Sequence, residues 1–554
     1  MSRKYLSIFL LMVVMICCVS AASATDVDNI TVPDDTNIIA DDIVESVDDV
    51  EIDDVSGSDD VETDDGVDDV ESDEVSGSDD VEADDVKDTT LTSTRGIIDI
   101  YTSNYNQYFS STGVLTSTSG DDLRFNGNFN SLRFTNFIIN DDISIDATNA
   151  TFQNVGFSLI AGNITFTGGT FTTTTTTKVN HVIDISAGDV EVNGVTMNLN
   201  APNNKEFVAI NVNGGTNVEL LNNIITYTCN YVNKNVINYV IRVKNSPNAL
   251  ITGNNITAYL PLKEVAYYTS SDQMDWDRVA VVGIESSNGF NLSYNNIEVN
   301  VSDVDDSYPT LDAVIVLFSE DAYIGHNKVI EIDNVTEEGS ANYLYAIDVY
   351  SCNHLNIDNN TIKLSSMGGS FINNTLGTST AYGIQLTGGH NVTISNNDID
   401  TRNNGPNAGI YSQNYGGPTN LTIVNNTIYA EGNAGSSSWS LVTGMELQDN
   451  YGYIAGNKIT VYNKQGYVNG SNAYGISYSQ WGMANPVFNI TNNCVNLING
   501  DYAVYIKSSD FTTYVTDNCL TSTHYVGDNA VYRAANVVIS GNHNCTCTNC
   551  PVHP

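Results

Sequence analysis

The sequence predicts an all-β protein in which short strands stack as a parallel β-helix behind an acidic N-terminal segment. Three observations lead to this prediction. From Phe125 onward, the 554-residue chain is rich in Asn, Thr, Gly, Ile, Val and Tyr, which favours strands over helices. One pattern recurs throughout that region: an apolar residue, two further residues, Asn, one residue, and a second apolar residue. Each copy is too short to bury its own apolar side chains, so successive copies must stack on one another.

Residues 1–24 have the features of a secretory signal peptide. A charged start precedes an apolar run from Leu6 to Val19, and a small-residue cleavage site ends at Ala24. The apolar run is shorter than the roughly 20 residues that cross a bilayer. We therefore expect a chain that is secreted or displayed on the cell surface and has no membrane span after signal removal.

Residues 25–95 form an acidic segment that we expect to be a disordered linker. The segment is dominated by Asp and Glu, has few aromatic residues, and repeats the string at 55–62 once more at 75–82. It accounts for much of the formal net charge of −46. The whole chain has only 20 Lys and Arg residues. Binding to nucleic acid needs clustered basic residues, so we expect no nucleic-acid partner.

The remaining chain divides into a predicted cap, residues 96–130, and the β-helix itself, residues 131–554. The cap would cover the open edge of the first strands. Within the helix, a second strand motif precedes each Asn pattern, as in Ala381-Tyr-Gly-Ile384. We therefore expect each repeat to contain two short strands and a corner.

The recurring Asn predicts the arrangement of the corner. If each Asn occupies the same bend of successive repeats, its amide lies beside the amides of the repeats above and below. Stacked amides can satisfy one another, whereas a lone buried Asn would cost about 1 to 3 kcal/mol. The predicted ladder comprises Asn223, Asn254, Asn295, Asn327, Asn360, Asn397, Asn426, Asn457, Asn493, Asn518 and Asn542.

This pattern resembles the asparagine ladder of right-handed parallel β-helices, and the chain as a whole resembles adhesin-like surface proteins of gut methanogenic archaea. The second resemblance rests on the signal peptide before an acidic Asp-Asp-Val tract, on the segments 103–110 and 121–127, and on the Asn-Asn-x-Ile repeats. It implies a right-handed helix, surface display and adhesion. The repeats are also similar to those of sugar-binding and sugar-cleaving β-helices and of the NosD copper-site assembly protein.

No set of catalytic residues is evident in the sequence. Polysaccharide lyases and hydrolases need carboxylates for acid and base chemistry. Arg242-Val-Lys244 is similar to the Arg-Ile-Lys of polygalacturonases, but the acidic and histidine motifs that accompany it there are missing before it. We expect Arg242 and Lys244 to be surface charges.

Acidic residues that we assign to one inter-strand loop form a weak candidate calcium site. They are Asp303, Asp305, Asp306 and Asp312. Carboxylate oxygens are the ligands that calcium prefers. The alternative is a solvated acidic loop without an ion, which is common in acidic proteins. No other cofactor is expected.

Loops of variable length follow the Asn patterns, and stacking would bring them onto one side of the helix. These loops carry large aromatic residues, which can bury apolar area while keeping a polar group available to a ligand. The predicted ligand-binding residues are Trp276, Trp439, Tyr267, Tyr268, Tyr308 and Tyr467. The alternative is that the loops fold down and bury these rings.

Cysteines near the C-terminus predict disulfides in an exported protein. Cys494 and Cys519 each follow a ladder Asn of successive repeats, so they should stack at about 4.8 Å, a spacing that permits a disulfide. For Cys545, Cys547 and Cys550, the sequence leaves open both disulfides and a metal site with histidine. Asn-x-Ser/Thr sequons such as Asn255 and Asn391 provide acceptor sites for glycosylation.

The sequence therefore favours an adhesin-like protein that binds extracellular glycans or surface proteins through loops on one side of a β-helix. An extracellular polysaccharide lyase or hydrolase on the same fold is the first alternative. An inert surface-layer component is the second.

Overall fold

The computed structural model describes residues 95–545, apart from 117, 119, 203–204, 230–237, 262–277, 303–309, 334–342, 367–379, 415–418, 435–440, 468–469, 481–486, 510–511 and 535. The predicted signal peptide and the acidic segment before Arg95 lie outside the described residues. No helix among the residues that the structure describes is long and apolar enough to cross a membrane.

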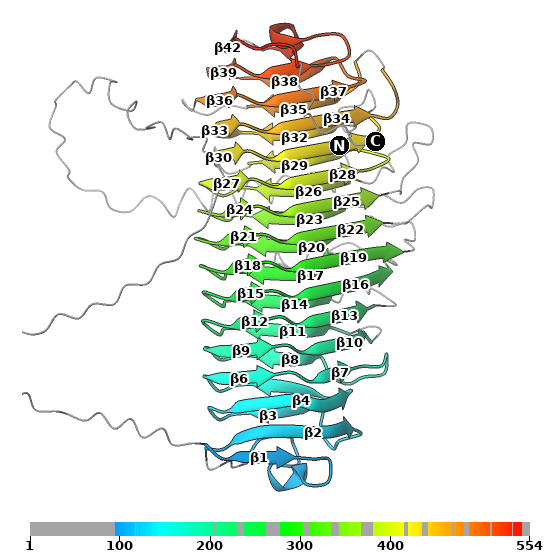
Figure 1. Cartoon of the computed structure of the whole chain (residues 1–554), viewed down its shortest axis with the longest axis vertical. Coiled ribbons are helices and arrows are strands. Elements are labelled where there is room, and N and C mark those ends of the chain that lie inside the picture. The colour runs from blue at the N-terminus through cyan, green and yellow to red at the C-terminus, as the bar shows by residue number, and fades with distance from the viewer. Residues whose placement is uncertain are drawn as a thin grey trace, which may run out of the picture. The chain divides into compact units, whose positions relative to one another are not determined.

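The chain forms a right-handed parallel β-helix whose strands lie in a 28-stranded and a 14-stranded sheet (Figure 1). The two-strand repeat predicted from the sequence is wrong, because a typical turn of the helix contains three strands. In one such turn these are β12 (Glu219–Leu221), β13 (Ile224–Thr228) and β14 (Asn238–Lys244). The first strand is only three residues long and ends just before the ladder Asn, so in the sequence it merges with the corner.

The 28-stranded sheet consists of two columns of strands on either side of the Asn corner. It begins with β1 (Ile97–Ile100), β2 (Asp122–Asn130) and β4 (Ser144–Gln153). The first column then contains β6 (Ile164–Thr167), β9 (Val190–Asn193), β12, β15 (Leu250–Thr252), β18 (Asn291–Ser293), β21 (Tyr323–Gly325), β24 (Asn356–Asp358), β27 (Val392–Ser395), β30 (Thr419–Val424), β33 (Asn450–Ala455), β36 (Phe488–Thr491), β39 (Thr513–Thr516) and β42 (Val537–Ser540). The second column contains β7 (Thr170–Thr172), β10 (Thr196–Asn200), β13, β16 (Asn255–Pro261), β19 (Asn296–Ser302), β22 (Lys328–Asp333), β25 (Thr361–Ser366), β28 (Asp398–Arg402), β31 (Thr427–Gly432), β34 (Lys458–Asn463), β37 (Cys494–Ile498) and β40 (Cys519–Thr521).

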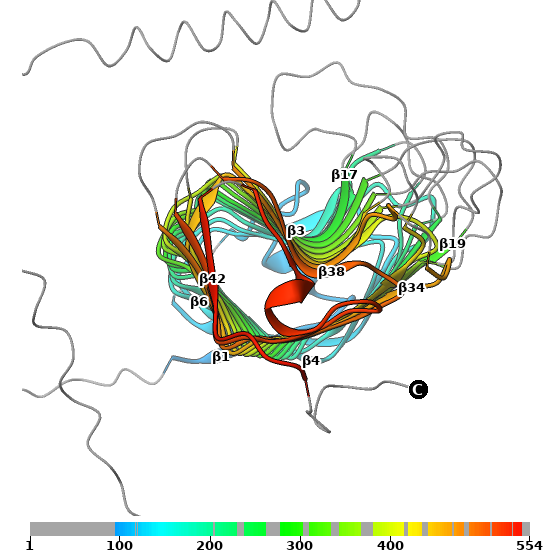
Figure 2. The same ribbon diagram turned by 90° about the horizontal axis from the view of Figure 1, so that it is seen from above.

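The 14-stranded sheet closes each turn. Its strands are β3 (Asn136–Ile139), β5 (Gly156–Leu159), β8 (His181–Ile185), β11 (Phe207–Asn213), β14, β17 (Arg278–Glu285), β20 (Thr310–Leu317), β23 (Tyr343–Tyr350), β26 (Thr380–Thr387), β29 (Asn407–Gln413), β32 (Val442–Gln448), β35 (Ala473–Ser479), β38 (Tyr502–Ser508) and β41 (Val531–Tyr532). Two short 3-10 helices, η1 (Tyr105–Gln107) and η3 (Gly527–Ala530), lie near the two ends of the described chain. Viewed along the stack, the strands of each column superpose around a common interior (Figure 2).

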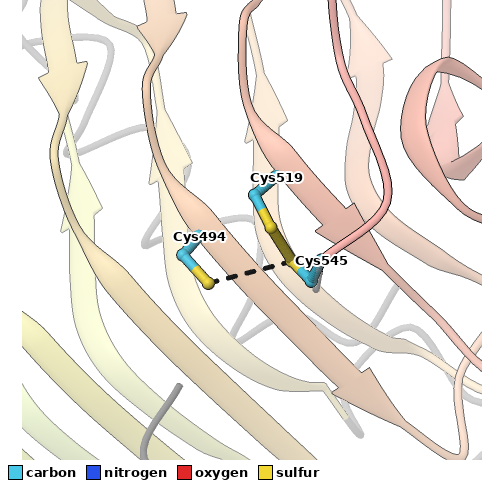
Figure 3. Close-up of side chains that lie close together, drawn as sticks. All are labelled: Cys494, Cys519 and Cys545. Carbon is cyan, nitrogen blue, oxygen red and sulfur yellow. Dashed lines mark hydrogen bonds between the residues drawn. A yellow bond between two sulfur atoms is a disulfide. The ribbon is translucent and has the colours of Figure 1, made fainter. Parts of the chain in front are cut away.

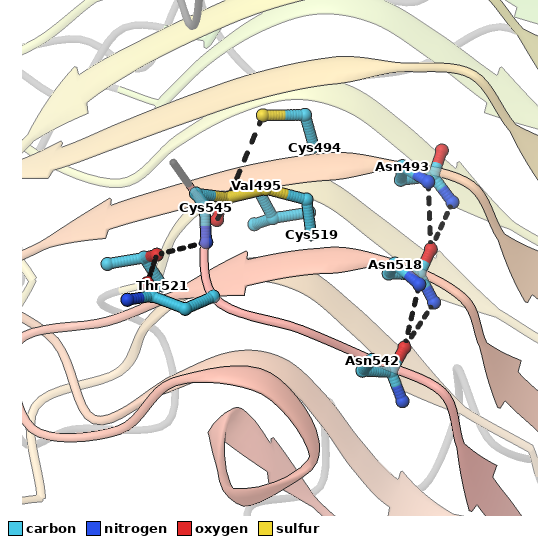
Figure 4. The surroundings of a disulfide bond; sticks show 9 residues. Asn493, Cys494, Val495, Asn518, Cys519, Thr521, Asn542 and Cys545 are labelled. Atoms are coloured by element: carbon cyan, nitrogen blue, oxygen red, sulfur yellow. Dashed lines mark hydrogen bonds between the residues drawn. A yellow bond between two sulfur atoms is a disulfide. The ribbon is translucent and has the colours of Figure 1, made fainter. Parts of the chain in front are cut away.

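The structure contains the predicted asparagine ladder. Each ladder Asn from Asn223 to Asn518 donates its side-chain amide to the Oδ1 of the next, at 2.9 to 3.0 Å. The main-chain N–H of each also donates to the same oxygen, as Asn327 does to Asn360 at 3.0 Å. Asn542 ends the ladder by donating to Asp528 Oδ1 at 2.7 Å, and Figure 4 shows the last three members.

The residue before each ladder Asn explains why the motif is so often Asn-Asn. That residue has a left-handed backbone, with φ of 54° at Asn222 and 56° at Asn359, and glycine replaces it at Gly253. Asn tolerates this conformation better than most residues, because its short polar side chain can hydrogen-bond locally. The first Asn therefore makes the bend and the second forms the ladder.

The apolar interior lies between the sheets, and one cluster of fully buried Ile, Val, Leu and Phe runs the length of the helix. In the 14-stranded sheet, the glycine of the Tyr-Gly-Ile motif brings the backbone close to the facing strands, and Gly444 occupies the same position in the Thr-Gly-Met sequence of β32. A Cβ on Gly444 would lie 2.7 Å from the carbonyl oxygen of Gly475 and would also collide with Ile459. Glycine is therefore required at this position for the sheets to pack.

Residues 96–130, which the sequence assigns to a cap, contain η1 within the segment Ser103–Ser110 and the strands β1 and β2. Both strands join the 28-stranded sheet in parallel register.

Candidate functional site

Most of the aromatic residues predicted to bind a ligand lie outside the described residues, namely Trp276, Trp439, Tyr267, Tyr268 and Tyr308. The described member, Tyr467, is 40% exposed. Its hydroxyl donates to Asp501 at 2.9 Å, and its ring meets His524 edge-on at 4.2 Å between centroids. The proposed role of the loop aromatics stays a prediction.

The predicted calcium ligands are not shown as a group. Asp303, Asp305 and Asp306 lie outside the described residues. Asp312 was assigned to the same loop, and that assignment is wrong, because β20 begins at Thr310 and Asp312 is a fully buried strand residue. Calcium binding by this chain therefore stays a prediction.

A buried carboxyl group lies near Asp312. Burial and the neighbouring carboxylates of Asp312 and Asp333 raise the pKa of Glu331 well above its usual range. Ser366 donates its hydroxyl to Asp333 at 2.9 Å. Burial therefore favours the uncharged form of Glu331, which costs less to bury than the charged form.

The thiol pair predicted from the sequence has the expected register. Cys494 and Cys519 are partners in adjacent strands, as expected, yet the disulfide in the structure joins Cys519 to Cys545 (Figure 3). The chain after β42 pairs His543 with Cys519, and this brings Cys545 across the strand, 4.9 Å from Cys519 between Cα atoms. A disulfide between Cys494 and Cys519 stays a prediction, and Cys547 and Cys550 lie outside the described residues.

Cys494, Cys519 and Cys545 also lie close enough together to share a metal ion. Among the described residues, they are the one group of three or more His, Cys, Asp or Glu side chains for which this is so. The sulfur of Cys494 lies 3.8 Å from that of Cys545 (Figure 4). Because two of the three sulfurs are joined in a disulfide, this arrangement closes the last turn covalently.

The outer face of the 14-stranded sheet carries a different set of functional side chains. Residues of this sheet alternate between the interior, where Leu344, Ala381 and Ala473 pack, and the outer face. On the outer face, neighbouring strands place matching residues side by side in two rows. The first row includes Tyr345, Tyr382, Ala408, Thr443 and Tyr474, and the second includes Asp348, Gln385, Tyr411, Glu446, Ser477 and Tyr505.

At the N-terminal end of this face, the side chains form ion pairs. Arg242 lies 3.3 Å from Glu206, and Lys244 lies 3.0 Å from Glu285. Arg242 and Lys244 are thus partly exposed members of ion pairs on this face, with side chains 18% and 29% exposed.

Further along, tyrosine rings stack in two groups. In the first group, the ring centroids are 5.6 Å apart for Tyr345 and Tyr382 and 4.5 Å apart for Tyr382 and Tyr411. In the second group, they are 4.2 Å apart for Tyr474 and Tyr505 and 4.7 Å apart for Tyr505 and Tyr532. The planes of neighbouring rings are within 24° of parallel, so the ring faces point along the helix axis.

A groove of about 490 Å³ lies between the two groups, and we call it the tyrosine groove. Tyr411 lines it from the first group and Tyr474 from the second, and its polar lining includes Gln413, Glu446, Gln448, Ser477 and Lys507. The Tyr411 hydroxyl donates to Gln413 Oε1 at 2.6 Å, and the Gln448 amide donates to Glu446 Oε1 at 3.0 Å. The groove therefore offers aromatic faces together with amide, hydroxyl and carboxyl groups.

The electrostatics of the tyrosine groove favour neutral hydrogen-bonding groups. Burial raises the pKa of the Glu446 carboxyl above its usual value, although the Gln448 amide and the Lys507 ammonium act in the opposite direction. Burial and the nearby Glu446 carboxylate raise the pKa of Tyr382 well above its usual range. The phenols therefore keep their protons at neutral pH and can donate hydrogen bonds to a ligand.

Sequence reasoning missed these tyrosines, because it placed the ligand on the loops. The signal was present in the Tyr-Gly-Ile motif, since Tyr382 and Tyr474 precede its glycine. Successive residues of a strand face opposite sides of a sheet, so a Tyr next to an inward-facing Ala lies on the outer face.

Comparisons with known proteins found similarities to solved structures alone. No protein-family model matches the sequence, and no curated protein matches it. Among solved structures, the chain is similar to the Dettilon tailspike protein, with 11% identity, a TM-score of 0.33, and coverage of 66% of this chain and 68% of the tailspike. It is also similar to the periplasmic alginate epimerase AlgG, with 11% identity, a TM-score of 0.34 and coverage of 76% and 84%.

A third similar structure is the surface protein and adhesin PfbA of Streptococcus pneumoniae, with 11% identity, a TM-score of 0.30 and coverage of 64% of this chain and 91% of PfbA. The likeness to all three proteins concerns the fold alone.

Proposed function

We propose that this protein is an extracellular, surface-associated binding protein that recognises glycans through the tyrosine groove. The observation that supports this most directly is a solvent-open groove with stacked tyrosines at both ends and amide, hydroxyl and carboxyl groups between them. Aromatic rings bury the apolar faces of a ligand, while the polar groups fix its orientation. The predicted signal peptide and the resemblance to adhesin-like surface proteins support an extracellular, adhesive role.

The groove is better suited to binding than to cleavage of glycosidic bonds. Glycosidases use a pair of carboxyl groups about 5 to 10 Å apart, one of which donates a proton. Among the described residues that line the tyrosine groove, Glu446 is the only carboxylate. One carboxyl group with aromatic neighbours can hold a sugar hydroxyl, but it lacks the second group that hydrolysis needs.

One observation favours the enzymatic alternative. The raised pKa of Glu446 is a property of general acids, because a protonated carboxyl can give up its proton to a leaving group. A lyase or hydrolase would still need a second acid or base beside the ligand. We therefore keep polysaccharide cleavage as the second candidate function.

The test is glycan-array binding of the secreted chain, followed by calorimetry with the strongest glycan and by assay for released sugars. Tyr411→Ala should weaken binding about tenfold, because the ring at one end of the groove is lost. The matched control is Tyr294→Ala, since Tyr294 is 64% exposed and belongs to the turn between β18 and β19.

Equal losses for the two variants would place the ligand elsewhere. Release of reducing or unsaturated sugars that stops in Glu446→Gln would establish the enzyme. Absence of binding to every glycan would refute the proposal and favour a protein partner or a structural role.

A further inference from the structure

The tyrosine ladder on the 14-stranded sheet lacks one ring. From β23 to β41, six of the seven strands of this sheet contribute a tyrosine to the ladder, in the order Tyr345, Tyr382, Tyr411, none for β32, Tyr474, Tyr505 and Tyr532. The strand without a ladder tyrosine is β32, which has Thr443 in the first row and Glu446 in the second. The missing ring and the tyrosine groove therefore occupy the same place.

The width of this gap follows from the strand spacing. Tyr411 belongs to β29 and Tyr474 to β35, which are separated by β32. Two strand steps of about 4.8 Å separate the two rings by about 9.6 Å along the helix axis. A flat ring halfway between would lie about 4.8 Å from each, within the 4.2 to 5.6 Å that separates the stacked tyrosines of the ladder.

The side chains at the missing position are suited to receive a ring with hydroxyl groups. Thr443 is fully buried, and its hydroxyl has no hydrogen-bond partner among the described residues. Glu446 lines the groove and accepts one hydrogen bond from Gln448, which leaves its second carboxyl oxygen able to interact with a ligand. Each neighbouring strand has an aromatic ring in one of the two rows, whereas β32 has a small side chain in the first row and a carboxyl group in the second.

We propose that this gap is a subsite for a single sugar ring, held between the faces of Tyr411 and Tyr474 with a hydroxyl directed to Glu446. The inference rests on the proposed glycan-binding function and makes it more specific. The sugar ring replaces the missing tyrosine of the ladder, with its plane across the helix axis. Both apolar faces of the ring are covered, and its hydroxyls lie at the edge, where the polar groups are.

The geometry limits how much of a glycan can be bound. The layers above and below the gap are filled by tyrosines, so a polysaccharide that ran along the helix axis would find no second gap between β23 and β41. One ring therefore accounts for most of the binding energy. A simple methyl glycoside should bind nearly as tightly as a long chain of the same sugar, with one molecule per protein.

The test measures binding of methyl glycosides of glucose, galactose, mannose and N-acetylglucosamine to the secreted chain by saturation-transfer NMR and calorimetry. At least one should bind, and its affinity should be within about threefold of that of the matching oligosaccharide. Tyr474→Ala should weaken binding about tenfold, whereas Tyr532→Ala should not, since Tyr532 is a ladder tyrosine that does not line the groove.

Two substitutions of Glu446 distinguish the contribution of the open gap to binding from that of the carboxyl group. Glu446→Tyr fills the missing layer and should abolish binding while the thermal unfolding temperature stays the same or rises. Glu446→Gln leaves the gap open and should retain binding with an affinity reduced about three- to tenfold.

The outcomes distinguish this inference from the proposed function. If oligosaccharides bind and methyl glycosides do not, or if Glu446→Tyr binds as the unmodified chain does, the single-ring subsite is refuted and glycan binding stands. If neither oligosaccharides nor methyl glycosides bind, both proposals are refuted. If Glu446→Tyr does not fold, the test is the comparison of Tyr474→Ala with Tyr532→Ala. Equal affinities of these two variants for the methyl glycoside would refute the subsite.

Discussion

Replacement of Asn360 by alanine interrupts the asparagine ladder near its middle. Asn360 is 1% exposed. Its Oδ1 accepts from both the main-chain N–H and the side-chain amide of Asn327, at 3.0 Å each, and its own amide donates to Asn397 at 2.9 Å. In Asn360→Ala, the Asn327 main-chain N–H is left buried without an acceptor. An unsatisfied buried group costs about 1 to 3 kcal/mol, and the other lost hydrogen bonds bring the expected destabilisation to about 2 to 4 kcal/mol.

The assay is equilibrium unfolding in urea, followed by circular dichroism. The matched control is Asn359→Gly, because Asn359 is the preceding residue and has a left-handed φ of 56° that glycine adopts readily. The control should change the free energy of unfolding by less than about 1 kcal/mol. A destabilisation by Asn360→Ala no larger than that of the control would refute the reasoning that the ladder stabilises the helix.

Three further predictions concern other parts of the helix. Burial opposes protonation of His181, but hydrogen bonds to Asp184 and Glu206 raise its pKa to about 9. The protonated His181 therefore contributes its full stabilisation below about pH 6.5, and this contribution is lost as the pH rises through 9. The free energy of unfolding in urea should decline over that pH range in the unmodified chain and not in His181→Asn. Equal declines in the two proteins would contradict this role of His181. Gly444→Ala should lower the free energy of unfolding, measured in urea, by about 1 to 3 kcal/mol, because the new methyl group collides with the facing strand. An unchanged free energy of unfolding would show that the sheets do not pack this closely. Peptide mapping without reduction should recover Cys519 linked to Cys545, and a Cys494–Cys519 peptide would overturn that pairing.

Sequence reasoning predicted the features that repeat. The Asn pattern gave the stacking, the ladder and the parallel register, because a side chain that recurs at one bend must meet its own copies in a solenoid. The register of Cys494 beside Cys519 followed from the same argument and is confirmed. Such predictions need no knowledge of distant contacts.

Features that depend on contacts between different parts of a turn could not be predicted in this way. In most turns the first strand has only three or four residues, so its pattern merges with the corner, and a repeat of two strands was predicted where there are three. The bond from Cys519 to Cys545 depends on how the chain crosses back after β42, which has no counterpart in the repeat. The assignment of Asp312 to a loop failed because β20 starts two residues before it.

The candidate site was missed for a related reason. Each tyrosine of the ladder belongs to a different strand, and some lie in the first row of the outer face and others in the second, as Tyr382 and Tyr411 do. No fixed spacing in the sequence therefore identifies the group. The absence of a ring at β32 becomes visible only when the strands are aligned in the sheet. The loop aromatics were easier to find, because they lie in segments of variable length.

The most direct test of the account is a crystal structure of the chain with the glycan that binds it most tightly. The account predicts electron density for a sugar ring between Tyr411 and Tyr474, with a hydroxyl within hydrogen-bonding distance of Glu446. Density for the sugar on the outer face of the 28-stranded sheet, or on the loops with the tyrosine groove empty, would contradict it.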